Sequence, residues 1–174
     1  MKILLVSDNH GDKSILKTIM QRFGNQVDGL FHCGDSNLAS SLPIMTNFRT
    51  VMGNTDQGLN YPKVITQQIG DQVVTVTHGH LYHVNMTMTP LLLLAQETQA
   101  DVVAFGHTHQ LAVTMEDNRL LINPGSISYP RGQYADIGGT FAIVEATKDY
   151  FNVQYYDRKM QALPNLKFSW HRTK

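Results

Sequence analysis

The sequence predicts an α/β fold, on three observations. Short apolar runs alternate with polar loops and with stretches of helical spacing, the rhythm of strands and helices arranged in layers. The chain has 174 residues, of which 42% are hydrophobic and 16% charged, enough apolar material for one core. Residue types that carry chemistry gather in the loops that follow the apolar runs. We therefore predict one compact domain spanning residues 1–174.

The first half of the chain alternates strands with helices. Residues 3–6 form an apolar run that predicts a buried strand, and residues 14–23 have helical spacing, with Asp12 placed as N-cap. The strands expected next are 29–31, 48–52, 64–69 and 72–77, with a short helix near 37–42. Gly70 and Asp71, between the last two of these strands, are typical of a hairpin turn.

The second half predicts one more helix and several strands. Thr89 followed by Pro90 is typical of an N-cap and first helical position, so a helix is expected from there through about Thr98. The elements expected after it are a strand at 102–105, a hairpin turning at 116–118, and strands near 140–146 and 150–156. The pattern after Arg158 is mixed and assigns no element.

Composition and charge argue against several classes of protein. Lys plus Arg equals Asp plus Glu at 14 each, and the sequence pI is about 7.1, so no overall basic field attracts nucleic acid or an anionic membrane. The single cysteine, Cys33, excludes an intrachain disulfide. The apolar runs at 3–6 and 91–95 are too short for a signal peptide or a membrane span. We expect a soluble, cytoplasmic protein.

Seven candidate site residues follow apolar strands. They are Asp8, His10, Asp35, Asn54, His78, His107 and His109. Loops at the carboxyl ends of strands meet in α/β sheets, so these side chains are candidates for a single site. Carboxylate, imidazole and amide ligands suit Mn, Fe, Zn, Co or Ni better than Ca or Mg. Seven ligands exceed what one such ion binds, so the sequence predicts two divalent ions about 3.5–4 Å apart.

The motifs SDNHG, HCGD, GNTD, THGH and FGHTH, followed by NPGSISYPRG, occur in order between residues 7 and 132. In this series the sequence resembles the calcineurin-like metallophosphoesterase superfamily, and within it the small YfcE-like phosphodiesterase branch. The resemblance implies an αββα sandwich, two mixed β-sheets flanked by helices, and a binuclear centre with manganese as the first choice of metal. It assigns Asp8, His10, Asp35 and His109 to one ion, and a bridging Asp35 with Asn54, His78 and His107 to the other.

The resemblance and the ligand chemistry together predict a phosphodiesterase that hydrolyses a small phosphodiester by in-line attack of a metal-bridging hydroxide. Asn54 and Arg131 are candidates for contacting the phosphate, the latter by its guanidinium. Many members of the superfamily carry a histidine directly after the asparagine, where this chain has Thr55, a poor general acid. We therefore expect diesters or aryl esters to be preferred over alkyl monoesters. His80 is a candidate substitute as proton donor and substrate contact.

Other interpretations remain open at the level of sequence. One is a phosphomonoesterase of the same fold. Another is a Vps29-like scaffold that acts through protein contacts, which predicts missing ligands, although all seven are present here. A nuclease would need a local basic groove, and a homo-oligomer is possible. His32 could support Asp35, while Asp12 and Asp56 have simpler roles as helix caps or turn residues.

Overall fold

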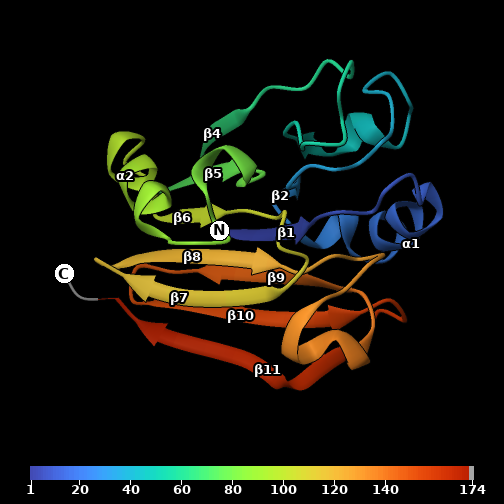
Figure 1. Ribbon diagram of the computed structural model, residues 1–174. Helices are drawn as coiled ribbons and strands as arrows, with labels where there is room; N and C mark the ends of the chain where they lie inside the picture. The colour runs from blue at the N-terminus through green and yellow to red at the C-terminus, as the bar shows by residue number, and fades with distance from the viewer. Residues whose placement is uncertain (173–174) are drawn as a thin grey trace.

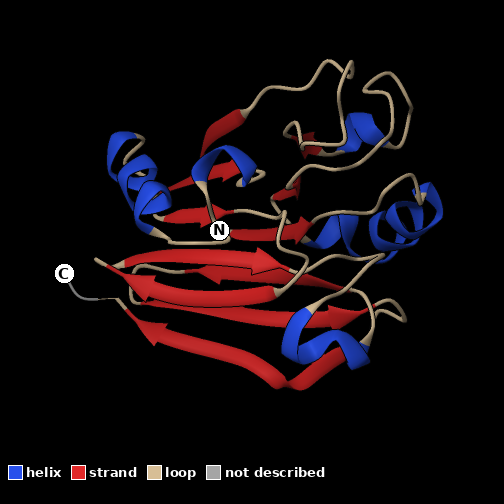
Figure 2. Ribbon diagram, viewed as in Figure 1, coloured by secondary structure: helices blue, strands red, loops and turns tan. Residues whose placement is uncertain are grey.

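The structure, a computed structural model that describes residues 1–172, is a sandwich of two mixed β-sheets with helices on its outer faces (Figures 1 and 2). This confirms the predicted αββα arrangement. The six-stranded sheet has the order β11-β10-β9-β1-β2-β3. Its strands are β1 (Lys2–Val6), β2 (Gly29–His32), β3 (Arg49–Thr50), β9 (Thr140–Ala146), β10 (Tyr150–Asp157) and β11 (Ala162–His171).

The five-stranded sheet has the order β4-β5-β6-β8-β7. Its strands are β4 (Val64–Ile69), β5 (Gln72–Thr77), β6 (Val102–Ala104), β7 (Leu111–Glu116) and β8 (Arg119–Pro124). The helices are α1 (Lys13–Phe23), α2 (Thr89–Glu97) and four short 3-10 turns, η1 (Gly24–Gln26), η2 (Met45–Asn47), η3 (His80–Tyr82) and η4 (Gly132–Ile137).

Three apolar clusters hold these layers together. Between the sheets, residues such as Ile3, Leu5 and Val76 form the central core. The opposite face of β1, with Leu4 and Val6, packs against α1. A third cluster packs α2 against the outer face of β6 and β8. Because β1 is buried on both faces, its sequence is a continuous apolar run rather than an alternating one.

Several predicted elements are confirmed at their local signals. The carboxylate of Asp12 accepts hydrogen bonds from the backbone N–H groups of Ser14 and Ile15, and so caps α1. The hairpins β4–β5 and β7–β8 form at the expected turns. In the second turn, Asp117 and Asn118 both have positive φ, as a tight two-residue hairpin turn requires.

The helix predicted near 37–42 is wrong. That segment forms turns, and the first helical residues after β2 are the 3-10 turn at Met45–Asn47. Asn37 has a φ of 51°, and its backbone N–H donates to the carboxylate of Asp56 at 2.7 Å. A residue in the left-handed region lies outside the α-helical range of φ, so no α-helix starts at Asn37.

Three further boundaries differ from the sequence prediction. The strand expected at 48–52 is reduced to Arg49–Thr50, because the chain bends away into the GNTD loop. Thr89 is not the N-cap of α2, since that place falls to Met88 and no side chain caps the helix. The unassigned segment after Arg158 forms β11, an edge strand paired with β10 across an irregular register that hides its alternation.

Among the described residues, no helix is long and apolar enough to cross a membrane.

Candidate metal centre

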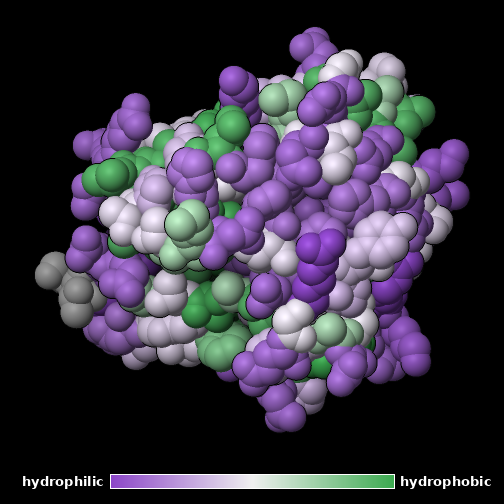
Figure 3. Space-filling view, in the orientation of Figure 1, coloured by the Kyte–Doolittle hydropathy of each residue, from purple (hydrophilic) through white to green (hydrophobic). Residues whose placement is uncertain are grey.

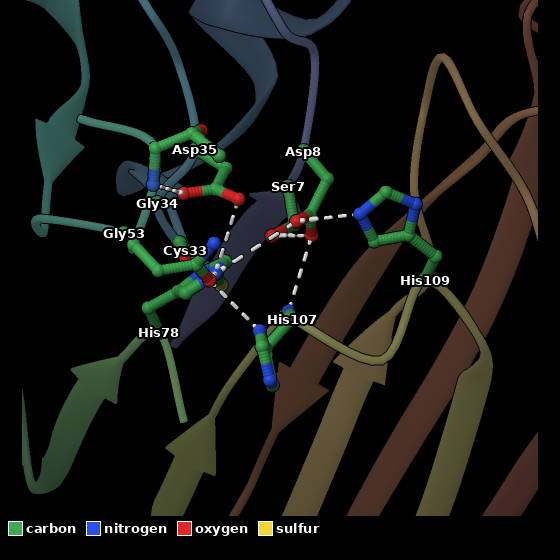
Figure 4. Close-up of polar contacts among 12 residues, drawn as sticks. Ser7, Asp8, Cys33, Gly34, Asp35, Gly53, His78, His107 and His109 are labelled. Atoms are coloured by element: carbon green, nitrogen blue, oxygen red, sulfur yellow. Dashed lines mark hydrogen bonds and ion pairs between the residues drawn. The ribbon is translucent and has the colours of Figure 1, made fainter. Parts of the chain in front are cut away.

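The sheet topology brings the candidate ligands to one edge. β1, β2 and β3 run parallel in the first sheet, and β5, β6 and β8 run parallel in the second. The loops after these strands therefore leave the sandwich on the same side. Figure 4 shows Asp8 and Asp35 with the rings of His78 and His109 turned toward them, while His107 contacts Asp8 through its backbone N–H. The structure brings all seven candidate ligands together at this edge.

Asp8, His10 and His109 form the first group of potential ligands, with donor atoms within 4.8 Å of one another. The Nε2 atom of His109 lies 3.3 Å from Oδ1 of Asp8 and 3.4 Å from Nε2 of His10. Two imidazole nitrogens that face each other beside a carboxylate need a proton or a cation between them. This arrangement fits a divalent ion.

Asp8, Asp35 and His78 form the second group. Nε2 of His78 lies 3.5 Å from Oδ2 of Asp35 and 3.9 Å from Oδ1 of Asp8. Oδ1 of Asn54 adds a neutral oxygen ligand, 3.1 Å from Nε2 of His78 and 2.9 Å from Nδ1 of His107. The two groups share Asp8, whereas the sequence expectation made Asp35 the bridging ligand. The identity of the bridging carboxylate stays a prediction.

One oxygen of Asp8 tests whether these residues fit a metal. The side chain of Asp8 is fully buried, and its Oδ1 has no hydrogen-bond partner among the described residues. The other oxygen, Oδ2, accepts from the hydroxyl of Ser7 and from the backbone N–H of His107. A buried carboxylate oxygen without a partner is costly, and a cation bound there would remove that cost. The donor set therefore fits divalent metal ions.

Backbone carbonyls and an amide fix the orientation of three imidazoles. Nδ1 of His78 lies 2.7 Å from the carbonyl oxygen of Cys33. Nδ1 of His109 lies 2.7 Å from the carbonyl oxygen of Tyr129. Nδ1 of His10 lies 3.0 Å from Oδ1 of Asn37. All three partners are acceptors, so each Nδ1 carries the proton and each Nε2 keeps its lone pair. These three lone pairs face the carboxylates, the tautomer that metal-binding histidines adopt.

The electrostatics of the site favour cations. Burial opposes charge on His78, but Asp35 and Asp8 raise its pKa above the ordinary value. The Asp8 carboxylate beside the ring raises the pKa of His109 and outweighs the opposing effect of burial. The pKa of Asp35 is lowered, because His78 and the backbone N–H of Thr55 outweigh burial. Without metal, the carboxylates thus favour proton uptake at Nε2 of His78 and His109, and a metal ion bound there would compete with those protons.

The local backbone at the site is unusual. Asp8, His10, Asp35, His107 and His109 all have positive φ, between 44° and 69°. Residues other than glycine rarely adopt this region, and such strain concentrates at functional sites. Two glycines in the loops of the site leave space for the candidate ligands. A Cβ at Gly53 would collide with the carboxylate and backbone of Asp35, and a Cβ at Gly34 would collide with the His78 ring.

Asp56 links two of the ligand loops, a role that its interpretation as a cap or turn residue missed. The side chain is fully buried. Its carboxylate accepts from the backbone N–H groups of Gly53 at 2.9 Å, Ser36 at 3.3 Å and Asn37 at 2.7 Å. The hydroxyl of Ser36 is a fourth donor, at 3.3 Å. Asp56 therefore holds the loop of Asn54 against the loop of Asp35.

His32 connects the SDNHG loop with the HCGD loop. Its Nε2 lies 2.9 Å from Oδ1 of Asn9, and its Nδ1 accepts from the backbone N–H of Gly34 at 3.2 Å. Burial lowers the pKa of this fully buried imidazole to about 4. This supports the expectation that His32 acts behind the ligands, as a neutral group that orients their loops.

The low pKa of His32 predicts a specific loss of stability in acid. In the unfolded chain the imidazole takes up a proton near pH 6.5, whereas in the folded protein it does so only near pH 4. Folding stability from this residue is therefore full above pH 6.5 and falls as the pH drops toward 4. For metal-free protein, the unfolding free energy between pH 7 and 4.5 should fall by about 2–3 kcal/mol more in wild type than in His32→Gln. Urea titrations at both pH values measure this, and equal losses would contradict it.

His80 and Arg131, the two other predicted site residues, lie beside the candidate ligands. The His80 ring is 5.3 Å from the His78 ring, and its buried Nδ1 has no hydrogen-bond partner among the described residues. Burial and then the neighbouring imidazoles lower the pKa of His80, so less of it carries the proton that a donor needs at neutral pH. Arg131 is exposed, and its backbone N–H donates to the carbonyl of His109 at 3.0 Å. Their contact with substrate stays a prediction.

Sequence reasoning missed supporting residues that come from unmarked loops. Asn85 places Nδ2 3.1 Å from Nε2 of His107. Ser126 donates from its hydroxyl to the carbonyl of Asp8 and accepts from two backbone N–H groups of its own loop, so it ties the NPGSIS loop to the floor of the site. The exposed ring of Tyr129 lies 5.3 Å from that of His10. Only proximity in the folded chain identifies Asn85 and Tyr129.

A family model described as the calcineurin-like phosphoesterase superfamily domain matches residues 1–149. The chain belongs to the calcineurin-like phosphoesterase superfamily. The probable metallophosphoesterase YsnB of Bacillus subtilis is 34% identical over 166 residues, which cover 95% of this chain and 96% of YsnB. These findings confirm the family that the motifs indicated, and they identify the chain as a phosphoesterase family member.

Solved structures of other proteins share the fold. A Streptococcus pneumoniae TIGR4 protein described as a predicted phosphoesterase has a TM-score of 0.94 and 35% identity, covering 98% of this chain and 97% of its own. The phosphoesterase YfcE of E. coli has a TM-score of 0.65 at 20% identity, covering 97% and 98% of the two chains. Vacuolar protein sorting 29 of Cryptosporidium parvum has a TM-score of 0.76 at 19% identity, covering 99% and 98%. The last two likenesses show the fold alone.

Proposed function

We propose that the protein is a metal-dependent phosphodiesterase with two divalent ions, of which manganese is the first choice. The observation that carries the proposal is the set of Nε2 lone pairs of His10, His78 and His109, aimed at buried carboxylates by hydrogen bonds on the far side of each ring. Membership of the superfamily supports phosphoester hydrolysis as the reaction.

The residues divide between two ions. One ion would be held by Asp8, His10 and His109. The ligands of the other would be Asp35, Asn54, His78 and His107. Divalent ions at such a site supply a nucleophile from water near neutral pH and offset charge on the phosphoryl oxygens. Arg131, exposed at the rim, would contact a phosphate oxygen with its guanidinium.

Thr55 supports a preference for diesters. Its backbone N–H donates to Oδ1 of Asp35 at 2.8 Å, and its hydroxyl donates to Oδ1 of Asn37 at 3.3 Å. These contacts hold its loop against the loop of Asp35. A threonine hydroxyl does not protonate an alkoxide leaving group efficiently. Substrates with good leaving groups should therefore react fastest, which favours diesters and aryl esters over alkyl monoesters.

The test is hydrolysis of bis(4-nitrophenyl) phosphate and 4-nitrophenyl phosphate by chelator-stripped protein refilled with Mn, Ni, Co, Zn or Mg. We expect diester turnover that needs metal and falls by at least about a hundredfold in His109→Ala. His171→Ala is the matched control, because His171 lies on β11 against Tyr150, away from the site, and should keep full activity.

Other outcomes would change the proposal. Faster turnover of the monoester would indicate a phosphomonoesterase. Metal binding without turnover of either ester, together with a protein that co-purifies in stoichiometric amount, would replace the enzyme with a scaffold.

A further inference from the structure

A groove of about 270 Å³ opens beside the candidate metal centre. The segment between η3 and α2, the end of β6, the GHTHQ loop and the start of β7 form its walls. Its lining residues are Val84, Asn85, Met88, Phe105, Thr108, Gln110, Leu111 and Ala112. In the face shown in Figure 3, hydrophilic residues predominate, and hydrophobic side chains gather over α2 and β7.

The groove begins at a candidate metal ligand. Asn85, at its rim, places Nδ2 3.1 Å from Nε2 of His107. The other ring nitrogen of His107 lies 2.9 Å from Oδ1 of Asn54 in the centre of the site. A single imidazole thus separates the groove from the second group of ligands. Thr108, which lines the groove, lies in the chain between His107 and His109.

The chemistry of the lining identifies what the groove can bind. Val84 is 3% exposed and Phe105 is 2% exposed, so these two side chains form an apolar floor. Met88 and Leu111 add flexible apolar walls. The polar groups of the lining are the neutral amides and hydroxyl of Asn85, Gln110 and Thr108, and no lining residue is charged. A second phosphate or another charged group would find no counter-charge there, whereas an uncharged apolar group would bury surface favourably.

The size of the groove limits the occupant to a single small group. Whole ligands generally occupy pockets of about 300–1,000 Å³, and a cavity of about 150 Å³ holds one benzene ring. A groove of about 270 Å³ open to solvent is therefore suited to one ring and its ester linkage. The rest of the ligand would lie over the metal centre.

We propose that this groove binds one ester substituent of the substrate, and that the substituent is a flat, uncharged ring such as an aryl group or a base. The inference rests on the proposed phosphodiesterase function and specifies its substrate class: phosphodiesters that carry a ring on one side of the phosphorus. Ala112 is the specificity residue best placed for a test, because it is exposed on β7, lines the groove and is not one of the proposed metal ligands.

The experiment measures binding instead of turnover. Methylphosphonate and phenylphosphonate share one head group, their carbon–phosphorus bonds resist hydrolysis, and they differ only in the ring. Isothermal titration of manganese-loaded protein should show roughly tenfold tighter binding of phenylphosphonate. In Ala112→Trp the indole fills the groove, so this difference should disappear while methylphosphonate affinity stays unchanged. In Thr114→Trp, two residues farther along β7 and outside the groove lining, the difference should persist.

The outcomes distinguish a failure of the groove proposal from a failure of the proposed phosphodiesterase function. Equal affinity of the wild type for both phosphonates would overturn the groove proposal and leave the metal centre intact. A ring preference that survives in Ala112→Trp would place the ring elsewhere and also overturn it. Failure of both phosphonates to bind manganese-loaded protein would contradict the proposed function itself and, with it, the groove as part of a substrate site.

Discussion

Asp8→Asn is expected to abolish metal-dependent hydrolysis, with a loss of at least about a thousandfold, and to remove metal binding. Asp8 belongs to both groups of potential ligands, so its charge lies close to both sets of donor atoms. Asparagine has nearly the same shape and tolerates the φ of 54° found at this position. The substitution therefore removes the charge and leaves the turn in place.

The same substitution should have little effect on the metal-free fold. A neutral amide costs less to bury than a fully buried carboxylate with an unpartnered oxygen. Against this, the carboxylate attracts protons to His78 and His109, and that interaction is lost. Because the two effects oppose each other, the unfolding free energy without metal should change by less than about 1 kcal/mol.

Three measurements check this expectation: bound metal per chain, hydrolysis of the aryl diester, and the shift in melting temperature on adding manganese. Wild type should melt higher with metal, since a ligand at a hundred times its dissociation constant contributes about 2.7 kcal/mol. Asp8→Asn should show no shift. The control is Asp12→Asn, which changes an equivalent charge at the N-cap of α1, where asparagine caps equally well. Retained metal and activity in Asp8→Asn would show that Asp8 is not a ligand.

Gly53→Ala is expected to destabilise the protein by about 3 kcal/mol and to displace Asp35 from the metal centre. The added methyl group would meet the backbone N of Asp35 and its Oδ1, which a hydrogen bond from the backbone N–H of Thr55 at 2.8 Å holds in place. The neighbouring N–H of Gly53 is bound to the buried carboxylate of Asp56 at 2.9 Å, which keeps the loop from moving aside. Metal affinity should fall together with stability.

Gly58→Ala is the matched control in the same loop. Gly58 has a φ of 80°, and nothing lies within 4 Å of a Cβ added there. Alanine should cost about 1–2 kcal/mol in backbone strain without affecting metal binding. Urea unfolding and metal titration of both variants separate collision at the site from general loop strain. Equal metal affinity of Gly53→Ala and Gly58→Ala would contradict the close packing of Gly53 on Asp35.

Local signals in the sequence determined much of the fold. The apolar run in β1, the Asp12 cap of α1 and the hairpin turns depend on neighbouring residues, so they are visible without the tertiary structure. The helix predicted near 37–42 was wrong because Asn37 has left-handed backbone, in a loop that a hydrogen bond to the distant carboxylate of Asp56 holds in place. The edge strand β11 was missed because its register with β10 is irregular.

The candidate ligands could also be chosen from the sequence, since the loops that follow parallel strands leave a sheet at one edge. Only the packing of the two sheets decided that both sets of loops meet at one site. Only the tertiary structure decided how they are held. The tautomers of His78 and His109 depend on the carbonyls of Cys33 and Tyr129, residues 45 and 20 positions away along the chain. The groove beside His107 likewise joins Asn85 to β7. Hydrogen bonds and cavities between distant segments leave no periodic pattern, because they arise from packing and not from local propensity.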